Sequence, residues 1–171
     1  ISSPLLRKEF TVDKKIDRAR VYICGLGFYE LLINGQRVGD HVHDPATTYY
    51  NNDQPFELGS RVLYATYDVT EYLKSGQNVL GVMLGNGWYS AEDDVAPSPS
   101  GFEPYGDRPI LIMQMNLESE EGEVLHVVSD RTWKTSSGPV TYNDYCHGES
   151  YDARLEKTGW SAPDYDDAEW Y

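Results

Sequence analysis

The side chains that could do chemistry are dominated by carboxylates. The 171-residue chain holds 28 Asp and Glu against 14 Lys and Arg, for a formal net charge of −14. Carboxylates can gather Ca²⁺, although most of them serve to solubilise a surface. A balance this acidic argues against a nucleic-acid partner, because phosphate binding needs clusters of Lys and Arg. No nucleophile–base pair, zinc set or phosphate-cradling loop is recognisable, so we assign no catalytic residue.

Cysteine and histidine form no recognisable metal motif. Cys24 and Cys146 lie far apart in the sequence. They could pair across a sandwich, but two residues do not define a disulfide framework, and a free buried Cys is common. His41 and His43 would share a face on a strand. Nothing nearby completes a ligand set around them, which favours a surface or turn role.

Short strands must position these side chains, since turn residues separate a series of apolar or alternating segments. Asn34-Gly35 lies between the apolar run 29–33 and residues 37–38, which predicts a type I′ hairpin. Gly25 to Gly27 predicts a bulge or tight bend. A short helical turn is expected within 68–78, capped by Asp68 or Thr70. Strands are expected over residues 5–12, 19–24, 28–33, 36–38, 61–68, 79–84, 108–118, 124–128, 131–135 and 140–145, and a loop-like end from 148 onward.

This pattern predicts an all-β protein, an antiparallel β-sandwich. The lack of βα alternation argues against Rossmann and α/β-barrel architectures. The length predicts one domain over residues 1–171. No apolar run approaches transmembrane length, so no membrane span is expected. No signal peptide is recognisable, and the start Ile1-Ser2-Ser3-Pro4 lacks Met, as expected of a processed or excised fragment.

Several motifs resemble the N-terminal domain of bacterial α-L-rhamnosidases of glycoside hydrolase family 78 type. The resemblance covers nearly the whole chain. The more specific motifs are Gly85-Asn86-Gly87-Trp88-Tyr89 and Gly148-Glu149-x-Tyr151-Asp152-Ala153-Arg154. The others are Gly25-Leu26-Gly27-Phe28-Tyr29-Glu30, Asn34-Gly35-x-x-Val38-Gly39-Asp40, Tyr67-Asp68-Val69-Thr70, Gly76-x-Asn78, Gly159-Trp160 and Asp166-Asp167-x-x-Trp170.

The resemblance implies a jelly-roll β-sandwich, galactose-binding-like, that belongs to a large multidomain glycosidase. In that family the catalytic carboxylates lie in an (α/α)₆ barrel further along the polypeptide, outside this sequence. Periplasmic, secreted and cytoplasmic bacterial locations all stay open. The implied partners are a rhamnose-containing carbohydrate and the downstream domains of the same polypeptide.

Some sandwiches of this family resemble rhamnose-binding modules that use Ca²⁺ to hold sugar hydroxyls. Ca²⁺ takes six to eight oxygen ligands. The candidate metal ligands are Asn86, Asp93, Asp94 and Asn143, with Asp144 beside the last. The candidate sugar-binding residues are Asn86, Trp88, Tyr89, Tyr49 and Asn51, with Trp88 and Tyr89 as an aromatic platform for a 6-deoxy sugar.

Each of these residues also has a structural interpretation. Trp88 could be a core or domain-interface anchor, and Asn86 between two glycines could be a turn residue. Asp93 and Asp94 could belong to a solvated acidic loop. Tyr49, Asn51 and Asn52 could pack on the catalytic domain. Glu149, Asp152 and Arg154 could form an internal ion-pair network that fixes a return segment.

The sequence therefore predicts a non-catalytic accessory domain of an α-L-rhamnosidase. Its role would be carbohydrate binding or, as the alternative, purely structural packing on the catalytic barrel. A structural module should carry an apolar patch where the barrel docks. A self-sufficient enzyme is the third hypothesis, and no recognisable set of catalytic residues supports it.

Overall fold

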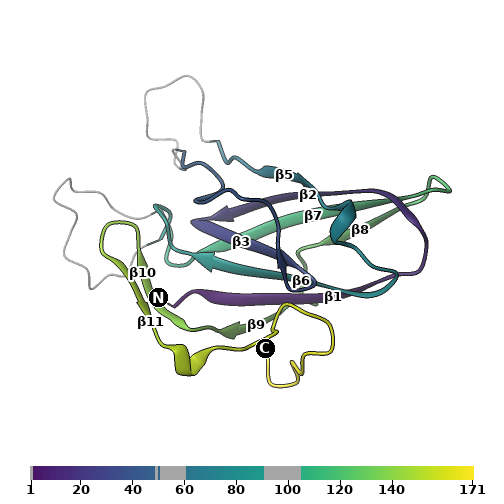
Figure 1. Ribbon diagram of the computed structural model, residues 1–171. Coiled ribbons are helices and arrows are strands. Elements are labelled where there is room, and N and C mark those ends of the chain that lie inside the picture. The colour runs from purple at the N-terminus through teal and green to yellow at the C-terminus, as the bar shows by residue number, and fades with distance from the viewer. Residues whose placement is uncertain (1, 49, 51–60, 91–104) are drawn as a thin grey trace.

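The computed structural model describes residues 2–48, 50, 61–90 and 105–171. In these ranges two antiparallel sheets pack face to face, and a small hairpin lies beside them (Figure 1). The strands are β1 (Pro4–Val12), β2 (Ile16–Leu26), β3 (Phe28–Ile33), β4 (Gln36–Arg37), β5 (Ala65–Asp68), β6 (Gly76–Gly85), β7 (Ile110–Ser119), β8 (Val124–Val128), β9 (Lys134–Ser137), β10 (Val140–Asp144) and β11 (Gly148–Tyr151). Two single 3₁₀ turns are η1 (Thr70–Tyr72) and η2 (Ala153–Leu155).

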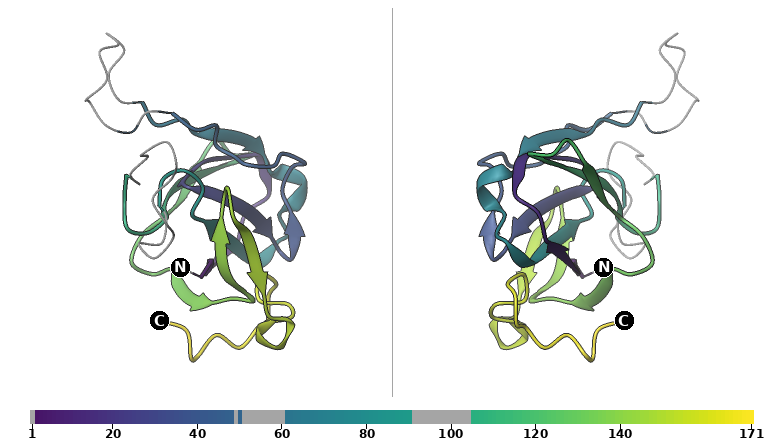
Figure 2. Two further views of the ribbon diagram at one scale, coloured as in Figure 1. Left: turned by 90° about the vertical axis from the view of Figure 1, so that its left-hand side faces the viewer. Right: turned by 90° about the vertical axis from the view of Figure 1, so that its right-hand side faces the viewer.

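The first sheet has the strand order β4-β3-β6-β1-β9, and the second has β5-β2-β7-β8. Hairpin β10–β11 stands at one end of the first sheet (Figure 2). The expected all-β, antiparallel sandwich is confirmed. The jelly-roll connectivity and the single domain over 1–171 stay predictions. Neither 3₁₀ turn could cross a membrane, nor could any other helical segment of the described ranges.

The core lies between the two sheets and follows the alternation of the strands. On β7, Met113, Met115 and Leu117 point inward and are at most 3% exposed, whereas Ile112 faces outward and is 66% exposed. The β6 run Val79–Leu84 is apolar on both faces because both faces are covered. The C-terminal segment crosses its outer face, where Trp160 and Ser161 pack directly over Gly81. A Cβ at Gly81 would lie 2.6 Å from the Ser161 Cβ, so this crossing requires glycine.

The predicted Asn-Gly hairpin is confirmed between β3 and β4. Asn34 and Gly35 have φ angles of 51° and 80°, the left-handed values that a type I′ turn requires. Asn34 also secures the neighbouring strand, because its carboxamide accepts a hydrogen bond from the Val79 amide and donates one to Asn78. The helical turn is shorter than expected, and its N-cap residue is Val69 rather than Asp68 or Thr70. Asp68 instead accepts hydrogen bonds from both the amide and the hydroxyl of Thr70.

Several strands differ from their expected bounds. β2 and β6 each begin three residues early, at Ile16 and Gly76, and two other strands begin three or four residues late. The strand predicted over 61–68 begins only at Ala65, where its pairing with β2 ends at Ile23. The strand predicted over 131–135 is β9, displaced to 134–137. A turn in which Asp130 accepts hydrogen bonds from Thr132 occupies the residues before it.

The expectation of a loop-like end from residue 148 is wrong for its first part. Residues 148–151 form β11, which pairs with β10. Asp144 makes this return possible, since its carboxylate accepts hydrogen bonds from the amides of Cys146 and His147. Gly148 follows with a φ of 86°, in the left-handed region.

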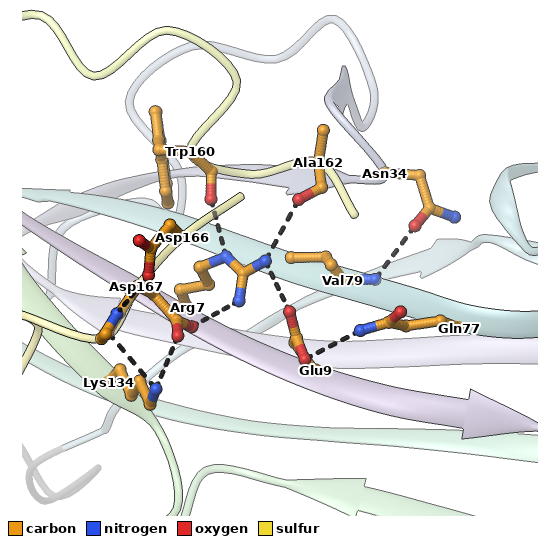
Figure 3. A network of polar contacts seen from close by, with 11 residues as sticks. Arg7, Glu9, Asn34, Gln77, Val79, Lys134, Trp160, Ala162, Asp166 and Asp167 are labelled. Atoms are coloured by element: carbon orange, nitrogen blue, oxygen red, sulfur yellow. Dashed lines mark hydrogen bonds and ion pairs between the residues drawn. The ribbon is translucent and has the colours of Figure 1, made fainter. Parts of the chain in front are cut away.

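The C-terminal segment is fastened to the first sheet by a buried arginine on β1 (Figure 3). The Arg7 side chain is fully buried. Its Nε and Nη2 donate to the carbonyls of Trp160 and Ala162 at 2.9 and 3.2 Å, and its Nη1 lies 2.5 Å from a carboxylate oxygen of Asp167. Lys134 on β9 donates to the other Asp167 oxygen at 2.6 Å. The segment thus depends on charges that lie near opposite ends of the sequence.

Replacing Arg7 with Met should lower the free energy of unfolding by about 3–5 kcal/mol, because Asp167 loses its buried partner. Equilibrium urea denaturation measures this. The control is Arg18→Met. Arg18 pairs with Glu118 at 2.6 Å, but both side chains are substantially exposed, so that loss of stability should be much smaller. An equal loss of unfolding free energy in the two variants would contradict the claim that buried Arg7 fastens the C-terminal segment.

Acid should weaken the same fastening. Partial burial favours a higher pKa for Asp167, but Lys134 and Arg7 outweigh it and hold the pKa below its ordinary value. The stability from Asp167 is therefore present above the unfolded-state pKa of about 3.9 and is lost as pH falls through the lower folded-state pKa. The difference in urea stability between wild type and Asp167→Asn should be largest near neutral pH and shrink below about pH 4. The same difference for Asp13→Asn, at an exposed turn, should be small throughout.

Candidate functional site

A groove of about 730 Å³ lies on the outer face of the first sheet, beyond the part that the C-terminal segment covers. Its floor is formed by outward-facing residues of β3 and β6, among them Phe28, Glu30 and Met83. One wall is the segment from Arg37 to His43, and the other is hairpin β10–β11. A volume of several hundred Å³ is typical of pockets for small molecules.

An aromatic cluster lines one end of this groove. The ring centroids of Phe28 and His43 are 5.0 Å apart, and the Tyr145 ring lies 6.1 Å from Phe28 and 5.9 Å from His43. The ring of Trp88 packs against Tyr145, with the two ring centroids 4.8 Å apart. Tyr145 is 51% exposed although it takes part in three of these contacts. Apolar ring faces next to polar side chains suit a ligand with both apolar and hydroxyl surfaces.

Asn86 and Asn143 hold the hairpin against the end of β6. The Asn86 amide donates to the Asn143 carboxamide oxygen at 2.7 Å, and the Asn86 side chain donates to the Asn143 carbonyl at 2.9 Å. The remaining Asn86 oxygen accepts from the Ser90 hydroxyl at 3.2 Å. Asn86 is 1% exposed. These contacts fix the distance between Trp88 and Tyr145, because each ring stands two residues beyond one of the two asparagines.

The other wall is held by Asp44. Its carboxylate accepts a hydrogen bond from the Tyr67 hydroxyl and lies 3.0 Å from His41 Nδ1. Its carbonyl accepts from the Tyr29 amide. Burial and contact with Asp44 raise the pKa of Tyr67, so its hydroxyl keeps its proton as a donor at neutral pH. The two histidines thus lie in a turn rather than on a strand, as the turn interpretation predicted.

Carboxylates on the floor and on the hairpin wall give the groove its polar character. Glu30 on the floor lies 3.7 Å from Arg37 of one wall, and the exposed Glu149 lies on the other wall. Partial burial favours a higher pKa for Asp144, but hydrogen bonds from the His147 ring and two backbone amides outweigh it and lower the pKa. Carboxylate oxygens accept the hydrogen bonds that ligand hydroxyls offer.

The structure brings three of the predicted site residues to hairpin β10–β11. Asn143 lines the groove, whereas Asn86 and Trp88 lie outside its lining and contact Asn143 and Tyr145. Tyr89 points elsewhere, and its ring packs against Tyr50 at 5.4 Å. The other predicted residues lie outside the described residues; these are Tyr49, Asn51, Asp93 and Asp94. The assignments to sugar and metal stay predictions.

Only two of the four predicted Ca²⁺ ligands, Asn86 and Asn143, lie in the described ranges. The carboxamide oxygens of Asn86 and Asn143 each already accept a hydrogen bond. No group of three or more His, Cys, Asp or Glu side chains in the described part of the chain could hold a metal ion. The described residues therefore do not fit a Ca²⁺ centre by themselves, and such a centre would depend on Asp93 and Asp94.

Sequence reasoning missed most of the residues that line the groove. Phe28 and Glu30 share the outward face of β3, opposite the buried Tyr29 and Leu31, and this alternation was a usable signal. No such signal marked His43 and Tyr145 of the aromatic cluster, because they lie in two turns that come together only when the chain folds. Asp152 pairs with Arg154 at 2.5 Å, whereas Glu149 of the same motif faces the groove.

The two cysteines do not pair in the structure. Cys24 is buried, Cys146 is exposed, and both are free thiols. Burial raises the pKa of the Cys24 thiol, which keeps it protonated at neutral pH. Cys24 therefore behaves as a small apolar residue of the sheet.

Fold and groove together define an all-β module with a ligand-sized groove on one sheet and without a recognisable catalytic set among its described residues. The chain belongs to the family described as the α-L-rhamnosidase N-terminal domain, whose model matches residues 14–171.

Relatives agree with this assignment. A curated α-L-rhamnosidase of Formosa agariphila is 39% identical over 96% of this chain and 16% of its own length. The solved α-L-rhamnosidase of Dictyoglumus thermophilum is 46% identical, with a TM-score of 0.84 over 99% of this chain and 17% of that one. The Streptomyces avermitilis α-L-rhamnosidase complexed with L-rhamnose is 37% identical, with a TM-score of 0.85 over 99% of this chain and 15% of that one. The chain thus spans about one sixth of these relatives.

Replacing Asn86 with Ala should lower the free energy of unfolding by about 1–3 kcal/mol, because buried partners lose their hydrogen bonds. The same change should release the hairpin, so the indole N–H resonance of Trp88 should shift in NMR spectra. Asn116→Ala is the control. Asn116 lies on β7 and accepts hydrogen bonds only near the surface, so its loss should be within about 0.5 kcal/mol. An unmoved Trp88 resonance in Asn86→Ala would show that Asn86 does not position this end of the groove.

Proposed function

We propose that this chain is the accessory N-terminal domain of an α-L-rhamnosidase, an enzyme that hydrolyses terminal α-L-rhamnosyl residues, and that it binds a rhamnose-containing carbohydrate in the groove. Family membership and the one-sixth share of each relative support the accessory role. The observation that carries the binding role is the exposed Tyr145 ring, held beside Phe28, His43 and Trp88 at the groove end.

The proposed ligand matches the chemistry of both parts of the groove. L-Rhamnose is a 6-deoxy sugar, so it combines an apolar methyl edge with several hydroxyl groups. The methyl edge and the C–H face would lie on the aromatic rings, which attract apolar surface. The hydroxyls would donate to Glu30 and Glu149, while Arg37 would donate to a sugar oxygen. Ca²⁺ stays part of the proposal only through Asp93 and Asp94.

A purely structural role is the second candidate, and a specific observation favours it. The outer face of the second sheet carries exposed apolar side chains, among them Tyr64 and Ile112, at 64% and 66% exposure. A domain that packs on a neighbour would need such a face. The two roles are compatible because the groove and this face belong to different sheets.

Isothermal titration with L-rhamnose tests the binding role. The expected result is saturable heat for the wild type, with an affinity about fivefold lower in Tyr145→Ala, since an aromatic contact contributes about 1 kcal/mol. Trp88→Ala should weaken binding in the same direction. Tyr151→Ala is the matched control, because Tyr151 is 53% exposed and lies on β11 outside the groove lining; its affinity should not change.

Repeating the titration with Ca²⁺ and then with EDTA separates two forms of the proposal. Heat that disappears with EDTA would establish a calcium-dependent site and direct attention to Asp93 and Asp94. Heat that survives EDTA would leave a calcium-independent groove. No heat at millimolar rhamnose would remove the binding role and leave the structural one.

A further inference from the structure

The second sheet has one apolar end on its outer face. Tyr22, Tyr64, Ile112 and Val128 line a shallow depression there of about 380 Å³. The rings of Tyr22 and Tyr64 meet edge to face, with centroids 6.2 Å apart. Ile110, at the start of β7, adds a further side chain that is 46% exposed. We call these five residues the apolar patch.

Strand pairing makes the apolar patch continuous across the sheet. Tyr22 on β2 is the partner of Gln114 on β7, and Gln114 is the partner of Val128 on β8. Ile112 stands two residues from Gln114 on the same face, beside Cys24. Five large side chains thus gather from three strands and from the residue just before β5. Contiguous exposed apolar surface of this kind marks an interaction site, whereas single exposed apolar residues are ordinary.

The opposite end of the same face carries charged and amide side chains next to the exposed Val124, which sets a boundary to the apolar patch. Arg18 pairs with Glu118 there, and His126 contacts Asn116 at 2.8 Å. The residues of the apolar patch themselves carry no charge, although the chain has a net charge of −14. An apolar centre bordered by charged and amide side chains is the usual composition of an interface.

Other parts of the chain already occupy the outer face of the first sheet. The C-terminal segment packs over β6 and Arg7, and the groove occupies the rest. Nothing in the described residues does the same for the apolar patch. In the relatives, about five sixths of the polypeptide lies outside the part that this chain matches. That remainder is covalently attached, so its effective concentration at the patch is high and a modest apolar area is enough for docking.

We propose that the apolar patch is the surface on which this domain docks against the remainder of its own polypeptide. This inference rests on the proposed function in one respect, namely that the chain is part of a longer rhamnosidase. The groove faces away from the second sheet, so a docked domain leaves it open to solvent. Docking and sugar binding can then occur together.

Side-chain labelling of the full-length polypeptide with hydroxyl radicals tests the proposal without a mutation. Rates are normalised to those of the unfolded polypeptide. Ile112 should be labelled several-fold more slowly than Leu125, an aliphatic residue of β8 that is 49% exposed and lies outside the patch. Equal rates at the two residues would mean that solvent covers the patch in the whole protein, and the proposal would be wrong.

A matched pair of variants in the full-length polypeptide tests the energetic link. Ile112→Glu places a charge at the centre of the patch, and limited proteolysis should then release this domain several-fold faster. Val124→Glu is the control, since Val124 is 49% exposed at the polar end of the same sheet; its release rate should match the wild type. Because Ile112 is 66% exposed in this chain, the substitution leaves the core unaltered. Equal release rates in the two variants would overturn the proposal.

Two further readouts separate this inference from its rivals. If light scattering shows a dimer that Ile112→Glu converts to a monomer while proteolytic release stays unchanged, a second copy covers the patch and the proposal is wrong. Rhamnose titration of Ile112→Glu should give the wild-type affinity. A wild type that binds no rhamnose yet protects Ile112 would remove the binding role and support docking.

Discussion

The buried guanidinium of Arg7 is the constraint on which the first sheet depends. A fully buried charge is costly unless it is paired and hydrogen-bonded. The backbone groups of the neighbouring strands cannot serve as its partners, because they already hydrogen-bond to one another in the sheet. One acceptor is the carboxylate of Glu9 on the same strand, 2.7 Å from the guanidinium, and the others come from residues 160–167, at the other end of the sequence. The C-terminal segment must therefore cross β6 and β1, and it can do so closely only because Gly81 has no side chain.

This crossing also determines where a ligand could lie. The segment covers the middle of the outer face, so the groove is confined to the end of β3 and β6 beyond it. Two short walls then define the groove, each held by one buried or half-buried polar side chain: Asn86 for the hairpin and Asp44 for the opposite turn. The aromatic rings are placed by these polar contacts more than by the apolar core, since Tyr145 stands at the tip of a hairpin and is half exposed.

Local patterns predicted the parts of the fold that depend on neighbours in sequence. Alternation on β7 and the Asn34-Gly35 turn were sufficient because side-chain period and positive φ are local properties. The groove was not predictable in this way, because His43 and Tyr145 meet only after four separate segments fold together. The return strand at 148–151 was missed for a related reason: it depends on the carboxylate of Asp144 capping two amides, which resembles an ordinary polar turn in sequence. No local pattern marked Arg7 as buried, since all of its partners except Glu9 are more than 150 positions away.

The two outer faces of the sandwich divide in chemistry, and this division bears on how such a domain could serve a larger enzyme. One face presents rings beside carboxylates and an arginine, which favours a hydroxylated ligand that exchanges with solvent. The other presents the exposed side chains of Tyr64 and Ile112, which favours a permanent apolar neighbour. Because the core between the sheets is close-packed, a domain fixed through the second sheet would hold the first at a defined distance and orientation. A weak sugar contact in the groove would then act at high effective concentration near the rest of the polypeptide.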